Sequence, residues 1–516
     1  MKHGLKALLV SSICVILLML ISFPVVYGYT EISGGRAFSA SGNSGVQGIV
    51  SPSGTATFII NPGTGTVSSA VSNSLNGDKF LLLKGTYFDN VEIDRSLSIK
   101  GVGEKNSVVD GQQAGSVFTI KPGAIVTLKD MTIQHGNAPL GGGIINGGIL
   151  TLDGVLITDN TAYDGGGILN LNTVNIDFGS SITDNTATGI SEDFGKGGGI
   201  LNGIGATVNM NHGSSISRNK ADNGGGIWIS KGGLVNMNSE STIKGNMAYV
   251  GGGIVNYGGT VNMNSGSSIT GNLANEGAGI ENDVNSVINM YKGSSISDNI
   301  AAVGKGGGIA NYGGTVNLYA GSSIGRNIAV LGGGIYSVGG VVTMDGGSIS
   351  HNKALGFPTA PGRGGGILSE YSVLNLISGS ISGNEASHVG GGVWNGGVMT
   401  MGSGMSIFDN TAGLGGGVYN HFGYINMQSG SSILGNAATG FTDGTGEFHQ
   451  GRGGGIFNLE APNSEYTLEF FDANGNPIPG YDPIFNDDLH FFGPKPSRPD
   501  NKPDDVYNTL TEDSET

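Results

Sequence analysis

Hydrophobic and polar residues alternate strictly in a short segment that recurs along most of this chain. In Val261-Asn262-Met263, two apolar side chains flank one polar side chain. A period of two residues is typical of a strand that buries one face. The same pattern predicts short strands at Val208-Asn209-Met210, Val235-Asn236-Met237, Ile288-Asn289-Met290, Val316-Asn317-Leu318, Leu374-Asn375-Leu376 and Ile425-Asn426-Met427.

Two other apolar segments accompany each alternating strand. A Gly-Gly-Gly-Ile segment, or a close variant, comes before it, and a Ser-Ile segment such as Ser268-Ile269 comes after it. Three short strands and three corners make one coil of a parallel β-helix. A triplet that recurs at a similar spacing and tolerates insertions indicates a solenoid. The triplets start at residues 141, 165, 197, 224, 251, 277, 306, 332, 364, 390, 415 and 453.

These patterns predict an all-β protein, a single-stranded right-handed parallel β-helix of about 15 three-strand coils. Helical repeats are excluded because no repeat sustains a 3.6-residue period. Glycine accounts for 98 of the 516 residues, yet the chain has no Gly-X-Y period, which excludes collagen. Thr66 to Asn76 places Val67, Ala70 and Val71 on one helical face, so we expect a short capping helix at the N-terminal end.

Glycine and asparagine recur at fixed positions in the coil. The triplet marks a corner that needs positive φ or a close approach of neighbouring coils. One asparagine follows two residues after the repeated Ile, as in Asn256, and another begins an Asn-x-Ala corner, as in Asn299. Stacked asparagine amides satisfy corner backbone groups, so we expect two asparagine ladders.

The sequence divides into six segments. We predict a signal peptide at 1–28, a linker at 29–44, the cap and first coils at 45–140, the repeat β-helix at 141–460, a closing strand or cap at 461–492 and an acidic, Pro-rich disordered tail at 493–516.

The first segment is typical of export. Lys2, His3 and Lys6 precede an apolar run that ends near Val26, and cleavage after it is our prediction, with a retained membrane anchor as the alternative. Cys14 is the only cysteine and lies in this run, so the mature protein has no disulfide. The net charge of −16 disfavours nucleic acids and anionic membrane surfaces. We expect a secreted or cell-surface monomer with no transmembrane span once the signal is removed.

Two parts of the sequence resemble known families. The segment GDKFLLLKGTYFDNVEIDRSLSIKGVG, followed by VVDG and VFTI, resembles the opening coils of pectin-lyase-like right-handed β-helix proteins. The GGGIxN…SSIxxNxA repeat resembles adhesin-like surface proteins and is similar to the repeats of chlamydial polymorphic outer-membrane proteins. The resemblance covers about residues 45–460 and implies the fold. It does not choose a function, because this fold serves enzymes and non-enzymatic surface proteins alike.

The residue after the repeated Ile varies from coil to coil, which is typical of an outward position. It includes both tryptophans of the chain. One interpretation is an exposed aromatic wall that stacks on sugar rings or on a partner protein. The alternative is that loops or the tail cover these side chains, or that they pack between coils. The candidate binding residues here are Trp228, Tyr336, Trp394, Tyr419 and Phe457.

Three insertions, at 188–196, 355–363 and 439–452, fall at the same corner of the coil. The last two lie about 14 Å apart along the axis at ordinary strand spacing. They suggest a ligand pocket between Arg363 and the loop that carries Glu447, His449 and Arg452, with tolerated surface loops as the alternative.

We therefore expect an adhesin-like surface protein that binds a polysaccharide or a surface protein without catalysis. The alternative is a polysaccharide lyase of the pectin-lyase superfamily, and a structural role in the cell envelope is the third possibility. The sequence shows no polygalacturonase or pectate-lyase motif, so no catalytic residue and no metal site are assigned. We expect no cofactor, with Ca²⁺ required only under the lyase alternative.

Overall fold

The computed structural model describes residues 46–50, 55–190, 195–357, 360–443, 445–460, 468–471 and 506–510. The chain divides into two units, Met1–Ser44 and Gly45–Thr516. The first unit, with the predicted signal peptide and linker, lies outside the described residues. Among those residues, no helix has the length and apolar character needed to cross a membrane.

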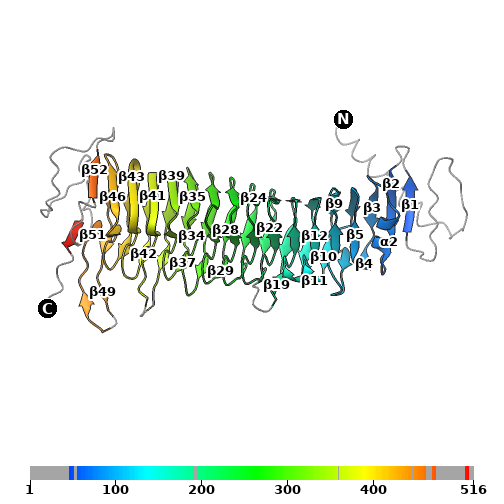
Figure 1. The fold of residues 1–516 in the computed structure, drawn as a ribbon, viewed down its shortest axis with the longest axis horizontal. Coiled ribbons are helices and arrows are strands. Elements are labelled where there is room, and N and C mark those ends of the chain that lie inside the picture. Colours follow the sequence, from blue (N-terminus) through cyan, green and yellow to red (C-terminus); the bar gives the residue numbers. More distant parts are fainter. Residues whose placement is uncertain are drawn as a thin grey trace, which may run out of the picture. The chain divides into compact units, whose positions relative to one another are not determined.

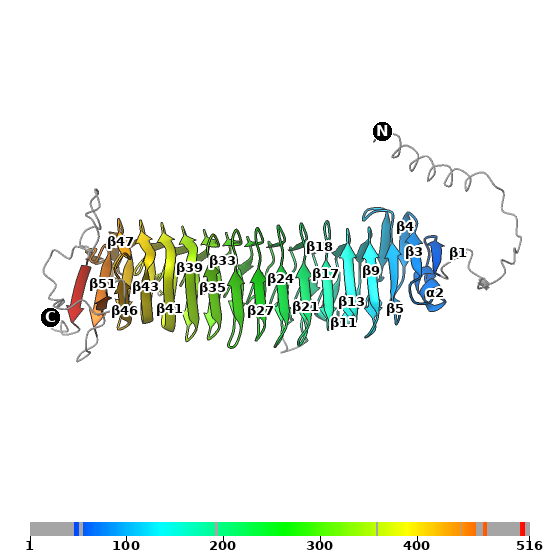
Figure 2. The ribbon, with the colours of Figure 1, turned by 90° about the horizontal axis from the view of Figure 1, so that it is seen from above.

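The second unit is an all-β parallel β-solenoid of about 14 turns with one short helix, which confirms the predicted fold class (Figures 1 and 2). Each turn contributes strands to three columns, and each strand pairs in parallel with the equivalent strand of the next turn.

The first column follows the glycine triplets. It consists of β5 (Val91–Ile93), β8 (Phe118–Ile120), β12 (Ile144–Asn146), β16 (Ile168–Asn170), β20 (Ile200–Asn202), β23 (Ile227–Ile229), β26 (Ile254–Asn256), β30 (Ile280–Asn282), β34 (Ile309–Tyr312), β38 (Ile335–Val338), the starts of β41 (Ile367–Ser382) and β43 (Val393–Phe408), β45 (Val418–His421), β51 (Ile456–Glu460) and β53 (Val506–Leu510).

The second column holds the alternating segments. It consists of β2 (Ala56–Ile60), β3 (Lys79–Leu82), β6 (Leu97–Lys100), β9 (Ile125–Lys129), β13 (Ile149–Asp153), β17 (Thr173–Ile176), β21 (Thr207–Met210), β24 (Leu234–Met237), β27 (Thr260–Met263), β31 (Val287–Met290), β35 (Thr315–Tyr319), β39 (Val341–Ser350), the middle parts of β41 and β43, β46 (Tyr424–Gln428) and β52 (Leu468–Phe471).

The third column holds the Ser-Ile segments. It consists of β4 (Gly85–Phe88), β7 (Ser107–Asp110), β10 (Thr132–Gln134), β14 (Leu156–Thr158), β18 (Ser181–Thr183), β22 (Ser215–Ser217), β25 (Thr242–Lys244), β28 (Ser268–Thr270), β32 (Ser295–Ser297), β36 (Ser323–Gly325), the last parts of β39, β41 and β43, and β47 (Ser432–Leu434).

Two-to-four-residue strands also pair at the Asn-x-Ala corner. They are β11 (Asn137–Leu140), β15 (Thr161–Asp164) and β19 (Thr186–Ala187) in one group, and β29 (Leu273–Ala274), β33 (Ile300–Ala301), β37 (Ile328–Ala329), β40 (Lys353–Ala354), β42 (Glu385–Ala386), β44 (Thr411–Ala412) and β48 (Ala437–Ala438) in the other.

The core is a stack of aliphatic side chains inside the coil. In the coil of β26, β27 and β28, the inward residues Ile254, Val261, Met263 and Ile269 are fully buried. The alternation of apolar and polar residues in the sequence therefore corresponds to the alternation of core and surface positions in the structure.

The glycine triplet makes the sharpest corner of each coil. Its first glycine has φ between 55° and 69° in all twelve repeats, a region that side chains with Cβ disfavour. The third glycine allows the coils to approach. A Cβ on Gly253 would lie 2.5 Å from the carbonyl oxygen of Gly279 in the next coil. The middle position is less strict, since Ala278 occupies it in one coil and is fully buried.

Both predicted asparagine ladders are present. In the Asn-x-Ala ladder, Asn299 donates from Nδ2 to Oδ1 of Asn327 at 2.9 Å and to the carbonyl of Ile269 at 3.1 Å. Its own Oδ1 accepts from the backbone N–H and Nδ2 of Asn272. The other ladder is interrupted at Ile229, where Asn202 donates to backbone carbonyls instead. The amides thus link each coil to the next in the buried interior.

The N-terminal end is closed by α2 (Thr66–Ser72) and by β1 (Val46–Val50), which pairs antiparallel to β2. Val67, Ala70 and Val71 of α2 are buried, as the helical face predicted. Oδ2 of Asp89 accepts from the backbone N–H groups of Val67 and Ser68 at 2.9 Å, which satisfies the start of the helix.

At the C-terminal end, the predicted closing strand is observed as β52, which pairs with β46. The segment assigned to a disordered tail contains β53, which extends the first column beyond β51. The sequence did not predict this strand. The remainder of 493–516 lies outside the described residues, so disorder there stays a prediction.

We predict that Asn299→Ala lowers the free energy of unfolding by about 2–4 kcal/mol, because it leaves buried N–H and carbonyl groups of neighbouring coils without partners. Thermal and denaturant unfolding of the purified protein measure this loss.

Asn289→Ala is the matched control. Asn289 also belongs to an asparagine row, with hydrogen bonds to Asn262 and Asn317 at 2.9 Å, but it lies on the partly exposed outer face of β31. We expect a loss below about 1 kcal/mol. Equal losses for the two variants would contradict the structural role of the buried ladder.

Candidate functional site

The outer face of the first column forms a wall, which we define by three positions in each coil. These are the residue before the triplet, the residue after the repeated Ile and the residue after the following Asn. From Lys196 to Leu459, these positions vary from coil to coil and include both tryptophans of the chain. Strand register places equivalent positions directly above one another.

The predicted exposed aromatic strip is wrong for Tyr336, Trp394 and Phe457, which are buried, while Trp228 and Tyr419 are half-buried. Tyr336 and Trp394 pack with side chains of neighbouring coils, and Phe457 lies between Tyr419 and the strand β53 of the C-terminal segment, so both parts of the alternative, packing between coils and cover by the tail, have examples here. Wall side chains also lie over glycines of the following turn. A Cβ on Gly396 would come within 2.7 Å of the Trp394 ring, which therefore covers this glycine.

The wall aromatics pack with aliphatic residues that precede the triplets. Tyr336, Leu368, Val389 and Trp394 form a small hydrophobic cluster outside the main core, and Tyr419 packs against it. Further along the wall, Tyr419 stacks on Phe457 with ring centroids 5.1 Å apart. The wall is thus a second, outer apolar layer.

The third insertion forms a short antiparallel hairpin of β49 (Phe441–Thr442) and β50 (Phe448–His449). Oδ2 of Asp443 lies 2.9 Å from Nε2 of His449, and its Oδ1 accepts from the backbone N–H groups of Thr445 and Glu447. These hydrogen bonds hold the pKa of Asp443 well below its usual range. The ring of Phe441 stacks on His449 and also contacts His388.

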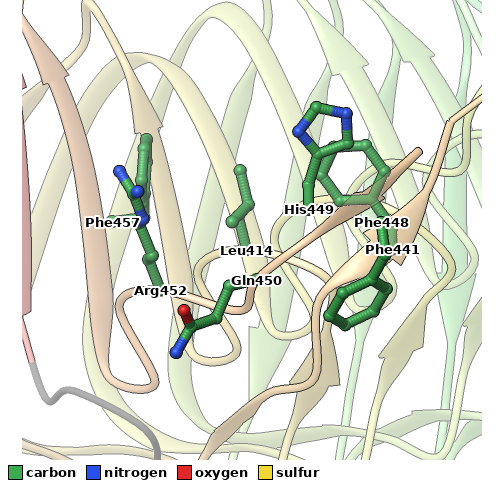
Figure 3. Close-up of a pocket in the computed structure, with 7 residues that line it drawn as sticks. All are labelled: Leu414, Phe441, Phe448, His449, Gln450, Arg452 and Phe457. Atoms are coloured by element: carbon green, nitrogen blue, oxygen red, sulfur yellow. The ribbon is translucent and has the colours of Figure 1, made fainter.

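The hairpin and the end of the wall enclose a pocket of about 340 Å³. Figure 3 shows Phe441, Phe448 and His449 on one side of it and Arg452 and Phe457 on the other. Among the described residues, the pocket lining includes no carboxylate, although the chain is acidic. The lining residues are Leu414, Phe441, Phe448, His449, Gln450, Arg452 and Phe457.

The structure brings together only part of the predicted site. His449 and Phe457 line the pocket, whereas Glu447, on the same hairpin, is exposed and does not. Arg363 lies on the wall nearby. Burial of the imidazole rings lowers the pKa of His388 and of His421, and the positive charge of Arg363 lowers both further. Tyr419 and Trp394 support the pocket from the adjacent coils, and Trp228 and Tyr336 lie farther along the wall.

Sequence reasoning missed Leu414, Phe441, Phe448 and Gln450 as lining residues. The sequence did contain a signal for Phe441 and Phe448, because both occur in the longest insertion of an otherwise regular repeat. The first insertion, by contrast, has four residues outside the described part of the chain, 191–194.

One coil of the wall is unusually acidic. It presents Glu276, Glu281 and Asp283, and the Tyr312 hydroxyl from the next coil donates to Oε2 of Glu276 at 2.9 Å. Oε2 of Glu281 is buried and has no hydrogen-bond partner among the described residues. Burial, and then the charges of Asp283 and Glu276, raise the pKa of Glu281 to about 8. This carboxyl therefore retains its proton at neutral pH.

Within the described ranges, no group of three His, Cys, Asp or Glu side chains is arranged to hold a metal ion. The Ca²⁺ considered under the lyase alternative has no such site there.

Comparisons with known proteins show no family for this chain. No protein-family model matches the chain, and no curated protein matches it. One similar solved structure is an alginate lyase from Paenibacillus sp. str. FPU-7, at 13% identity over 67% of this chain and 94% of that chain. Because the TM-score is 0.22, this similarity supports no argument about the chain. The chain is a parallel β-solenoid protein.

We predict that Glu281→Gln stabilises the protein and that the gain depends on pH. In the unfolded chain this carboxyl ionises near 4.5, but in the folded protein it keeps its proton up to about pH 8. The free energy of unfolding therefore falls as the pH rises between these values, and the glutamine removes that loss. The expected gain at pH 8 is roughly 4 kcal/mol, and it disappears near pH 4.5.

Thermal unfolding at pH 5 and pH 8 checks this prediction. Glu447→Gln, which replaces an exposed glutamate, is the control and should leave the unfolding temperature unchanged at both values. An equal effect of Glu281→Gln at pH 5 and pH 8 would show that Glu281 is not held protonated.

Proposed function

We propose that this chain is an exported surface protein that binds a neutral polysaccharide through its wall without cleaving it. The pocket beneath the 439–452 hairpin is its principal binding site. The observation that carries the proposal is this pocket, which exists because one coil departs from the repeat to add an aromatic hairpin.

The composition of the pocket suits a sugar ring. Phe448 offers an exposed apolar ring to the C–H groups of a pyranose, Phe441 and Phe457 add apolar surface to the pocket lining, and His449, Gln450 and Arg452 offer groups that bond to hydroxyls. A few polar groups among aromatic walls are the usual makeup of a small-molecule site. Asp443 fixes the orientation of His449, so the site is organised before a ligand enters.

The charges on the wall favour a neutral ligand. Between Lys196 and Leu459, the three wall positions carry four basic and four acidic side chains, and because Glu281 keeps its proton, their charges nearly balance at neutral pH. The basic ones are Lys196, Lys305, Arg363 and Arg452, and the acidic ones are Glu276, Glu281, Asp283 and Glu370. A polyanion would be repelled by the acidic coil and by the net charge of −16.

A second candidate, a polysaccharide lyase, is favoured by one observation. The Asp443–His449 pair has the geometry of a histidine oriented to exchange a proton, and it faces the pocket. Incubation with polyuronides, with and without Ca²⁺, tests this candidate through the ultraviolet absorbance of unsaturated products. If the wild-type protein forms these products and His449→Ala does not, the protein is a lyase and the binding proposal is wrong.

We predict that Phe448→Ala weakens polysaccharide binding by about tenfold, because it removes the most exposed ring of the pocket, which is 63% exposed. Affinity electrophoresis in gels that contain hydroxyethyl cellulose, xylan, glucomannan, alginate or polygalacturonate measures the change. At least one of the three neutral polymers should retard the wild-type protein.

Phe178→Ala is the matched control. Phe178 is 68% exposed, stacks on His212 and lies at another corner of the solenoid, so its loss should not change retardation. Wild-type protein that none of the five polymers retards, or equal effects of the two variants, would contradict binding at the pocket and favour a structural role in the envelope.

A further inference from the structure

A second aromatic surface lies on the same wall, far from the pocket. Trp228 and Tyr257 stack with ring centroids 5.8 Å apart, and Nζ of Lys196 lies 5.7 Å from the centre of the Trp228 ring. Tyr257 is 56% exposed, and Trp228 is half-buried. The Trp228 ring thus lies between Tyr257 and Lys196, and Tyr257 presents the exposed ring of the pair, unlike the buried Tyr336 and Trp394.

Strand register fixes the spacing between this pair and the pocket. Trp228 and Phe457 occupy the same position of the wall, eight coil-to-coil steps apart. At a strand spacing of about 4.8 Å, the two surfaces lie about 38 Å apart along the solenoid axis. The wall between them carries first the acidic coil of Glu276, Glu281 and Asp283, and then Tyr312, Tyr336, Trp394 and Tyr419, so the two surfaces lie on one and the same wall.

We infer that Trp228 and Tyr257 form a second sugar-binding platform, and that one polysaccharide chain runs along the wall and contacts the platform and the pocket together. This inference rests on the proposed function. It names the ligand class more closely, as an extended neutral polymer rather than a short oligosaccharide or a glycan end.

Continuity and charge support a single extended occupant. The coils between the platform and the pocket include the acidic coil of Glu276 and Asp283, which an uncharged chain crosses without repulsion. The protonated Glu281 adds no charge there at neutral pH. Two sites on one rigid solenoid raise the local concentration of a bound chain at the second site, so affinity should rise once the chain spans both.

Size-fractionated chains of hydroxyethyl cellulose, xylan and glucomannan test this inference by isothermal titration calorimetry with the full protein. Wild-type protein should bind chains longer than about 38 Å at least tenfold more tightly than fragments of two to four sugars. Tyr257→Ala should lose this gain and keep the affinity for the short fragments, because the pocket is intact.

Tyr291→Ala is the matched control. Tyr291 stacks on Tyr319 with ring centroids 5.1 Å apart and is 38% exposed, but it follows β31 at a different corner of the coil. Tyr291→Ala should leave the dependence of affinity on chain length unchanged. A long chain gains affinity statistically because it offers more places to bind, and this gain is the same in both variants, so the comparison isolates the platform.

Two outcomes would overturn the inference alone. In one, short fragments bind at the pocket with no gain for long chains. In the other, Tyr257→Ala keeps the full gain. A protein that binds neither short nor long chains would overturn the proposed function and the inference together.

Discussion

The close stacking of one coil on the next is the constraint on which the rest of this structure depends. The third glycine of each triplet allows it, because any Cβ there would meet the backbone of the next coil, as at Gly253. The buried amides then hold the stack. Each Asn of the Asn-x-Ala corner, such as Asn299, donates to the Asn of the next coil and accepts from the preceding one. Without disulfides in the described part, these contacts and the aliphatic core carry the stability.

The alternation of buried and outward residues explains why functional variation lies on the wall. In the first column the repeated Ile and the Asn two residues later are buried inside the coil, whereas the residue between them lies on the outer side. Tyr336, Leu368 and Trp394 pack there into an outer apolar layer, and the Trp394 ring lies over Gly396, next to the following turn. The wall can therefore change its chemistry from coil to coil without disturbing the core. The hairpin that carries Phe448 and His449 uses this freedom to build a pocket.

The repeating part of the fold was predictable because it is set by local patterns. Alternation placed Val261 and Met263 in the core, and the recurrence of Asn299 and its equivalents predicted their ladder. The burial of Trp394 was not predictable, because it depends on which side chains of neighbouring coils pack around it. The pocket was predicted only in outline. Insertion positions located His449, but the fold of the hairpin decides that Phe448 lines the pocket and Glu447 does not. The strand β53 lacks the repeat motif and gave no signal.

The central claim is that a polysaccharide occupies the pocket between the hairpin and the end of the wall. Hydrogen–deuterium exchange, measured with and without the neutral polymer that retards the protein most, tests it directly. The account predicts slower exchange in the peptides that cover 441–459 when the polymer is present, and unchanged exchange around Phe178. Protection spread evenly over the solenoid, or confined to peptides outside the wall, would contradict it.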